Sequence, residues 1–158
     1  MNSNAPTHRE LEGYVVRPAR PEDRPAMAEA FVAAGRAAWG FAGEAALAGM
    51  RAPEFAGGEL VVEDAQGVAG FAVLAGCELD LLYTHPRVWG RGAGRLLLAA
   101  AEDALRAAGC RDATLWTEER NERPRRVYEA AGWRLDGEVR ERVWNGAPLR
   151  ELRHRKRL

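Results

Sequence analysis

The chain has 158 residues, a length that suits a single domain with a sizeable buried core. Hydrophobic residues make up 47% and charged residues 29%, values that exclude a disordered or fibrous chain. Acidic and basic residues balance at 23 each, so the chain lacks the net positive charge that is typical of nucleic-acid-binding proteins.

The pattern of apolar and turn-forming residues predicts a mixture of strands and helices. Residues 1–12 are polar, and we expect a flexible N-terminal tail ahead of a single domain over 13–158. Strands are expected over residues 14–17, 60–62, 68–74, 79–84, 113–117, 133–143 and 149–156. Helices are expected from Pro21 through Ala34, over 41–51, over 94–108 and over 122–131. This order predicts an α/β fold in which helices cover the faces of a mixed sheet.

Neither a membrane segment nor a secretory signal is apparent. The longest apolar run, Val68–Cys77, has ten residues, about half of what a helix needs to cross a bilayer. Residues 1–12 lack the basic, apolar and small-residue pattern of a secretory signal. We therefore expect a cytoplasmic protein that has no membrane partner.

The two cysteines, Cys77 and Cys110, are expected to be reduced and buried. A single pair in a chain without an export signal is more typical of free thiols than of a disulfide. No closely spaced His or Cys accompanies either residue, so we expect no metal site.

Charge is distributed unevenly along the chain. Residues 1–119 hold 11 Arg and 17 Asp or Glu, a net charge of −6, whereas residues 120–158 hold 12 Arg or Lys and 6 acids, a net charge of +6. One interpretation is that two faces of one domain attract each other. The other is a basic wall beside an anionic ligand such as a phosphorylated cofactor. Charge alone leaves both open.

Three glycines at alternate positions form a loop between a predicted strand and a predicted helix, in Trp89-Gly90-Arg91-Gly92-Ala93-Gly94-Arg95. Glycine permits positive φ and close approach of the backbone to a ligand. The helix that follows begins with unpaired N–H groups and a partial positive charge. We therefore predict a pyrophosphate site, with added charge from Arg91 and Arg95. The P-loop Gly-Lys-Ser/Thr and the ribose-binding acid of a dinucleotide fold are both missing, which disfavours ATP and NAD.

A second motif covers residues 121–133. Asn121 is placed to cap a helix, and Pro124 falls in its first turn, where a missing N–H costs little. Tyr128 lies near the middle of this helix, and Gly132-Trp133 ends it.

Both segments resemble the GCN5-related N-acetyltransferase (GNAT) superfamily. The coenzyme A motif of that family is Gln/Arg-x-x-Gly-x-Gly/Ala, which residues 89–94 match except for Trp89. The later motif is Asn-x-x-Ala-x-x-x-Tyr-x-x-x-Gly-Phe, which residues 121–133 match with Pro124 for Ala and Trp133 for Phe. The order of elements over residues 14–156 is also similar. The resemblance implies the GNAT fold, a mostly antiparallel central sheet with flanking helices.

The same resemblance implies acetyl-CoA as the cofactor. Backbone groups of Leu82, Tyr83 and Thr84 would contact pantetheine, and residues 90–95 would hold the pyrophosphate. The full set of expected cofactor contacts is Leu82, Tyr83, Thr84, Trp89, Gly90, Arg91, Gly92, Ala93, Gly94, Arg95, Asn121 and Tyr128. The Trp89 backbone N–H keeps a place in this set, and its indole is expected either to pack on a ligand or to be half-buried on the surface.

Two expected catalytic roles follow from the family pattern. Tyr128 matches the general acid that protonates the departing thiolate, although a core aromatic at this spacing is the alternative. Glu78 matches the catalytic glutamate of the histone-acetylating branch. Asp80 is the alternative base, because period two places it on the same strand face as Glu78. Each carboxylate is equally compatible with a surface position.

These patterns lead to the hypothesis of an N-acetyltransferase that acetylates a primary amine of a small molecule or a protein by direct transfer. The alternatives are a coenzyme A-binding module without turnover and a transferase of a larger acyl group. Nucleic acid is not an expected partner, and a homodimer is plausible only by analogy with the fold. Substrate choice is expected to depend on residues 24–55 and 139–151, as it does in the family.

Overall fold

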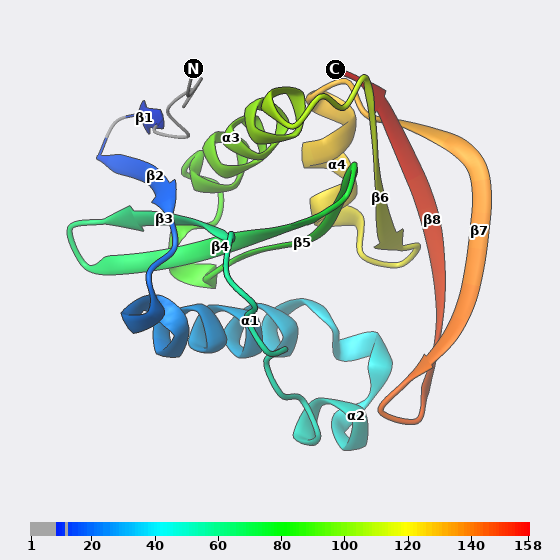
Figure 1. Ribbon diagram of the computed structural model, residues 1–158. Coiled ribbons are helices and arrows are strands. Elements are labelled where there is room, and N and C mark those ends of the chain that lie inside the picture. Colours follow the sequence, from blue (N-terminus) through cyan, green and yellow to red (C-terminus); the bar gives the residue numbers. More distant parts are fainter. Residues whose placement is uncertain (1–8, 12) are drawn as a thin grey trace.

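The computed structural model describes residues 9–11 and 13–158, which form an eight-stranded sheet with helices on both faces (Figure 1). The strands are β1 (Arg9–Leu11), β2 (Tyr14–Pro18), β3 (Leu60–Asp64), β4 (Gly67–Ala75), β5 (Glu78–Thr84), β6 (Asp112–Glu118), β7 (Arg134–Trp144) and β8 (Ala147–Arg157). The helices are α1 (Arg24–Ala38), α2 (Glu44–Ala48), α3 (Ala93–Ala107) and α4 (Glu122–Ala130). Short 3₁₀ turns lie at Pro21–Asp23, Gly40–Ala42 and Pro86–Val88.

The strand order is β1-β2-β3-β4-β5-β6-β8-β7, and every neighbouring pair is antiparallel except β5 with β6. The predicted mixed, mostly antiparallel α/β fold is therefore confirmed. Helices α3 and α4 lie on one face of the sheet and α1 and α2 on the other (Figure 1).

Each face of the sheet has its own apolar core. Helix α3 buries Leu97, Ala101 and Leu105, spaced to lie on one side, against the strands. Gly109, with φ of +90°, follows the end of this helix as its spacing predicts. On the other face, Phe31 of α1 packs among the apolar side chains of β3, β4 and β5. The two apolar cores therefore pack against opposite faces of β5.

The last hairpin has the predicted turn. Asn145 and Gly146 both have positive φ, 47° and 82°, as a type I′ turn between β7 and β8 requires. The Asn145 side-chain amide donates a hydrogen bond to the Ala46 carbonyl at 3.1 Å. This contact ties the hairpin tip to α2.

Part of the segment that we assigned to the tail is ordered as a strand. Residues 9–11 form β1, which pairs with β2 from Arg9 opposite Val16 to Leu11 opposite Tyr14. The rest of the expected tail, residues 1–8 and 12, lies outside the described residues. A three-residue edge strand carries too little periodicity to be recognised from sequence.

The expectation of free cysteines was wrong. Cys77 and Cys110 form a disulfide, with their Cα atoms 5.7 Å apart. Cys77 lies in the turn before β5 and Cys110 lies just before β6. Because β5 and β6 run parallel, their starting ends are neighbours, and this pairing is a property of the topology that composition does not reveal.

Strands β5 and β6 meet at one end only. Their recorded pairing is Glu78 opposite Thr114, with the Thr114 N–H donating to the Cys77 carbonyl at 3.2 Å. Beyond this point the strands diverge, and α4 fills part of the space between them (Figure 1). The divergence leaves one edge of β5 unpaired along most of its length.

No helix in the described ranges is both long and apolar enough to span a bilayer. Across the same part of the chain, no three His, Cys, Asp or Glu side chains converge to form a metal site.

Candidate active site

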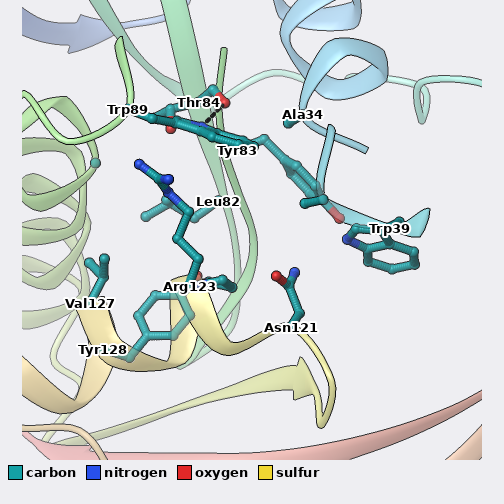
Figure 2. Close-up of a pocket in the computed structure, with 13 residues that line it drawn as sticks. Ala34, Trp39, Leu82, Tyr83, Thr84, Trp89, Asn121, Arg123, Val127 and Tyr128 are labelled. Carbon is teal, nitrogen blue, oxygen red and sulfur yellow. Dashed lines mark hydrogen bonds between the residues drawn. The ribbon is translucent and has the colours of Figure 1, made fainter. Parts of the chain in front are cut away.

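Three adjoining cavities line the divergence of β5 and β6. The glycine-loop cavity lies between residues 88–95 and α4. The central cavity is walled by residues 82–84 of β5 and by Asn121, Val127 and Tyr128 (Figure 2). The strand cavity lies between residues 79–83 of β5 and 115–118 of β6, with side chains of β7 and β8 at its end. The first and second cavities share wall residues, and so do the second and third, so the three adjoin; we refer to them together as the cleft.

The glycine loop presents unpaired backbone donors. Gly92 is the N-cap of α3, with φ of +93°, and its carbonyl accepts the first helical hydrogen bond, from Leu96 at 3.0 Å. No acceptor within the described chain faces the N–H groups of Gly90, Gly92, Ala93, Gly94 and Arg95. These donors lie at the positive end of a 15-residue helix. The local structure is thus suited to an anion.

Two amides of the expected set are already used within the protein. The Trp89 N–H donates to the Pro86 carbonyl at 3.1 Å, and the Arg91 N–H donates to the Val88 carbonyl at 3.4 Å. The 3₁₀ turn of residues 86–88 creates these bonds, because it continues directly into the glycine loop. The anion donors therefore come from the other five amides of the loop.

The Trp89 indole links the loop to β5 and α4. Its Nε1 donates to the Thr84 carbonyl at 2.9 Å, and the Arg123 guanidinium lies 4.3 Å above the ring (Figure 2). Both tryptophan and arginine line the central and glycine-loop cavities. Trp89 is thus half-buried, which was one of the two expectations, and it also forms part of the cleft wall.

Backbone groups of β5 alternate in direction along the cleft. The His85 N–H donates to the Ala69 carbonyl of β4 at 2.7 Å. Successive N–H groups of a strand point to opposite edges, so Thr84 and Leu82 present theirs toward the cleft. The Tyr83 N–H points toward β4 instead. Of the three residues expected to contact pantetheine, Leu82 and Thr84 have the appropriate backbone orientation, and Tyr83 contributes its side chain to the cavity wall.

Tyr128 faces the cleft at the junction of the central and strand cavities (Figure 2). Its ring packs near Trp133 and His154, with centroid distances of 6.4 and 6.2 Å. The hydroxyl has no hydrogen-bond partner among the described residues. Burial, with a smaller contribution from Tyr83, raises the pKa of Tyr128 well above its ordinary value. The phenol therefore keeps its proton at neutral pH.

Tyr83 lies across the junction from Tyr128. Its side chain extends from β5 toward Trp39 at the end of α1 (Figure 2), and its ring packs against Phe31 at 4.7 Å. Burial raises the pKa of Tyr83 to about 12, so this phenol is also protonated. Two neutral phenols thus line both the central and the strand cavities.

Asn121 occupies the predicted capping position but does not cap. Its side chain makes no capping hydrogen bond to α4, although its backbone N–H donates to the Glu118 carbonyl at 3.0 Å. The side-chain amide borders the central and strand cavities (Figure 2). It is therefore available to contact a ligand.

The two candidate bases have different surroundings. Glu78 lies where β5 and β6 still pair, accepts a hydrogen bond from the Thr114 hydroxyl at 3.3 Å, and lines none of the three cavities. Asp80 lines the strand cavity and has no ion pair within the described chain. A bulge explains the difference: Leu79 pairs with Leu74 and Leu81 with Val73, so Asp80 is the extra residue. The bulge breaks the period-two relation that we expected between Glu78 and Asp80.

Sequence reasoning missed several charged side chains of the strand cavity. Glu118 ends β6 and is 3% exposed. Burial acts to raise its pKa, but hydrogen bonds from Arg120 outweigh burial, and the pKa lies below its usual value. Arg140, Arg142 and Glu151 reach the cavity from β7 and β8. No local motif marks these residues, because long-range strand pairing brings them to the cleft.

The remaining basic residues near the loop are divided between structure and cavity. Arg95 and Arg126 line the glycine-loop cavity together with Arg123. Arg125 instead donates to the Glu119 carbonyl at 2.9 Å. His85 acts as a turn residue, as expected, because its Nδ1 accepts the Arg87 N–H at 3.1 Å. The basic segment over residues 120–158 therefore supplies part of the cleft wall and also forms internal ion pairs such as Lys156 with Glu102.

Comparison with known proteins agrees with this geometry. The acetyltransferase (GNAT) family model matches residues 24–133, whereas curated protein sequences yield no match. A GCN5-related N-acetyltransferase from Rhodopseudomonas palustris has a TM-score of 0.72 at 24% identity, over 96% of this chain and 99% of that one. The protein yncA from Salmonella typhimurium, solved with its cofactor acetyl-CoA, has a TM-score of 0.67 at 22% identity, over 93% and 95%.

The ribosomal-protein-S18-alanine N-acetyltransferase from Escherichia coli has a TM-score of 0.65 at 16% identity, over 91% of this chain and 93% of that one. At these identities the structural likeness establishes the fold. The family match extends over more than two thirds of the sequence and includes the glycine loop, Asn121 and Tyr128. The chain belongs to the acetyltransferase (GNAT) family.

Proposed function

We propose that the protein is an acetyl-CoA-dependent N-acetyltransferase that moves the acetyl group directly onto a primary amine of a small molecule or protein. One observation carries this proposal: adjoining cavities lead from the unpaired amides of the glycine loop past Tyr128 to the strand cavity. A cofactor and an acceptor entering from opposite ends would meet beside Tyr128.

The residues of the loop fit a diphosphate. Four of the five residues with unpaired N–H groups line the glycine-loop cavity, namely Gly90, Gly92, Gly94 and Arg95. The side chains of Arg95, Arg123 and Arg126 line it too. Gly92 has a positive φ. A Cβ atom at this position would lie 3.8 Å from Nη2 of Arg95, on the side of the cavity. A side chain here would occupy the space in which a phosphate would sit. These features support the cofactor assignment.

Bound acetyl-CoA would supply the acetyl group as a thioester. The N–H groups of Leu82 and Thr84 point into the cleft, and either is placed to polarise a carbonyl oxygen. Tyr128 retains its proton because burial raises its pKa, and it would donate that proton to the thiolate. Asn121 would orient the cofactor with its uncapped side-chain amide.

Asp80 is our choice of base because it lies in the cleft, whereas Glu78 does not. The need for a base depends on the amine. A lysine-like amine with a pKa of about 10.4 costs roughly 4–5 kcal/mol to deprotonate at pH 7, and an α-amine near 8 costs about 1 kcal/mol. We expect Asp80→Asn to lower kcat/KM by about 100-fold or more, and Glu78→Gln, the matched control, to stay within about twofold of wild type. Equal losses in the two variants would contradict this choice.

Two measurements test the proposed function. Calorimetry should detect binding of acetyl-CoA but not of NAD or ATP, and thiol release from acetyl-CoA should occur with members of an amine panel. Equal affinity for the three nucleotides would contradict the cofactor assignment. Tight binding of acetyl-CoA without thiol release would indicate a coenzyme A-binding module that has no turnover. Faster release from propionyl- or butyryl-CoA would identify a larger acyl donor.

A cytoplasmic location is also part of this proposal. A disulfide is unusual in a reducing compartment, so the redox state of Cys77 and Cys110 in intact cells is an independent test of location.

A further inference from the structure

The end of the strand cavity is built from two arginines that share one carboxylate. Glu151 of β8 is 5% exposed. It accepts hydrogen bonds from Nε of Arg140 at 2.5 Å and from Nε and Nη2 of Arg142 at 3.0 Å each. Both arginines belong to β7, and all three residues line the cavity. Glu118 also lines this cavity, but Arg120 pairs with it. Arg140 and Arg142 therefore share the single carboxylate of Glu151, which leaves one positive charge in excess at this end.

The arginines keep donors that the protein does not use. Both terminal nitrogens of Arg140 and Nη1 of Arg142 have no acceptor within the described ranges of the chain. The Arg140 guanidinium lies over the Trp116 ring, 4.3 Å from its centroid, and this contact restricts its position. Glu151 fixes Arg142 in a two-point contact. The free N–H groups are therefore held in place before any ligand arrives.

An anionic group from a different strand lines the same cavity. Asp80 projects from the β5 bulge and has no ion-pair partner in the described structure. Arg142, Glu151, Asp80 and Tyr83 all line this cavity. Tyr83 lines the central cavity as well, so it marks the junction between the two cavities.

We infer that the acceptor is an amino acid, with its amine between Asp80 and the Tyr83–Tyr128 junction and its carboxylate on the free N–H groups of Arg140 and Arg142. This inference rests on the proposed function. A carboxylate matches the forked donors of arginine, and an ammonium matches the unpaired carboxylate of Asp80. A polyamine or the lysine side chain of a basic peptide would place a second cation beside the arginines, and the excess positive charge would repel it.

The experiment compares each L-amino acid with its own carboxamide as acceptor, and includes β-alanine, γ-aminobutyrate and putrescine. A carboxamide keeps the amine and the side chain but removes the negative charge. We expect at least one amino acid to exceed its carboxamide in kcat/KM by about 10- to 100-fold, the range of a hydrogen bond to a charged group. Calorimetry with the same pair in the presence of coenzyme A should show the same order of affinity.

Variants locate the preference in the arginine pair. Arg142→Gln and Arg140→Gln should each raise KM for the amino acid by about 10-fold or more while leaving KM for its carboxamide unchanged. Arg142→Lys keeps the charge but lacks the fork, so we expect an intermediate value. Arg150→Gln is the matched control, because Arg150 lies on β8, pairs with Glu119 and lines none of the cleft. Thermal unfolding of each variant checks that the hairpin stays folded.

Different results would contradict the acceptor inference and the proposed function. If carboxamides or putrescine react as well as amino acids, or if the preference persists in both arginine variants, the acceptor inference is overturned and the proposed function stands. If no acceptor of any class releases thiol, both are overturned.

Discussion

Reduction of the Cys77–Cys110 disulfide should destabilise the protein substantially. The two cysteines are 33 residues apart, and the closed loop contains β5, the glycine loop and α3. Cutting the crosslink gives the unfolded chain more freedom, and the chain-entropy relation assigns about 4 kcal/mol to a loop of this length. For a chain of this size, each kcal/mol corresponds to about 2–4 °C. We therefore expect the melting temperature to fall by roughly 8–15 °C.

Circular dichroism during thermal unfolding, with and without a phosphine reductant, measures this shift. Mass spectrometry after thiol alkylation counts the free cysteines in each sample. The Cys77→Ala/Cys110→Ala double variant is the control, because its melting temperature should not respond to reductant. Two free thiols in the untreated protein would refute the pairing itself. A shift below about 2 °C with both thiols free would refute the entropic reasoning.

Three further predictions concern the cleft and its support. Tyr128→Phe should lower kcat by about 10- to 1000-fold, while the Kd for acetyl-CoA should change less than about twofold. An unchanged kcat would show that the phenol is not part of the mechanism. Gly92→Asp should abolish acetyl-CoA binding in calorimetry. Gly109→Asp is the control and should retain binding, because Gly109 has a similar φ of +90° but lies in open space away from the loop. Loss of binding in both variants would indicate backbone strain as the cause. Burial lowers the pKa of His154, so its contribution to stability is complete above its unfolded pKa of about 6.5 and is lost as pH falls below that value. Urea unfolding between pH 7 and 5 should therefore show a decline in wild type that His154→Asn lacks, and parallel profiles would contradict this assignment.

The elements that depend on local pattern were predictable from sequence. The 3.6-residue spacing of Leu97, Ala101 and Leu105 identified α3, and Asn145-Gly146 identified the final hairpin. The glycine loop was also identified correctly as a set of helix N-terminal donors, because glycine spacing and the start of a helix are both local signals.

Features that arise from distant pairing could not be predicted in the same way. The disulfide depends on the parallel arrangement of β5 and β6, and the arginine pair depends on the register between β7 and β8. The position of Asp80 depends on a bulge that sequence alternation does not reveal, since Leu79 and Leu81 are both apolar in either arrangement. The capping role of Asn121 was a reasonable expectation from residue type, but the side chain faces the cleft instead.

The pairing of Glu78 with Thr114 is the point at which two parts of the sheet meet, β1–β5 and β6–β8. We call this point the vertex and the two parts the arms of the sheet. From this vertex to the tip of β5 at Thr84, six residue steps span about 20 Å. A rotation of only about 5° at the vertex would move that tip by roughly 1.7 Å over this lever length. Substitutions beside the vertex, far from any bound molecule, would thus change the width of the gap between the arms. Selection for a new acceptor could act there without altering a single residue that contacts it.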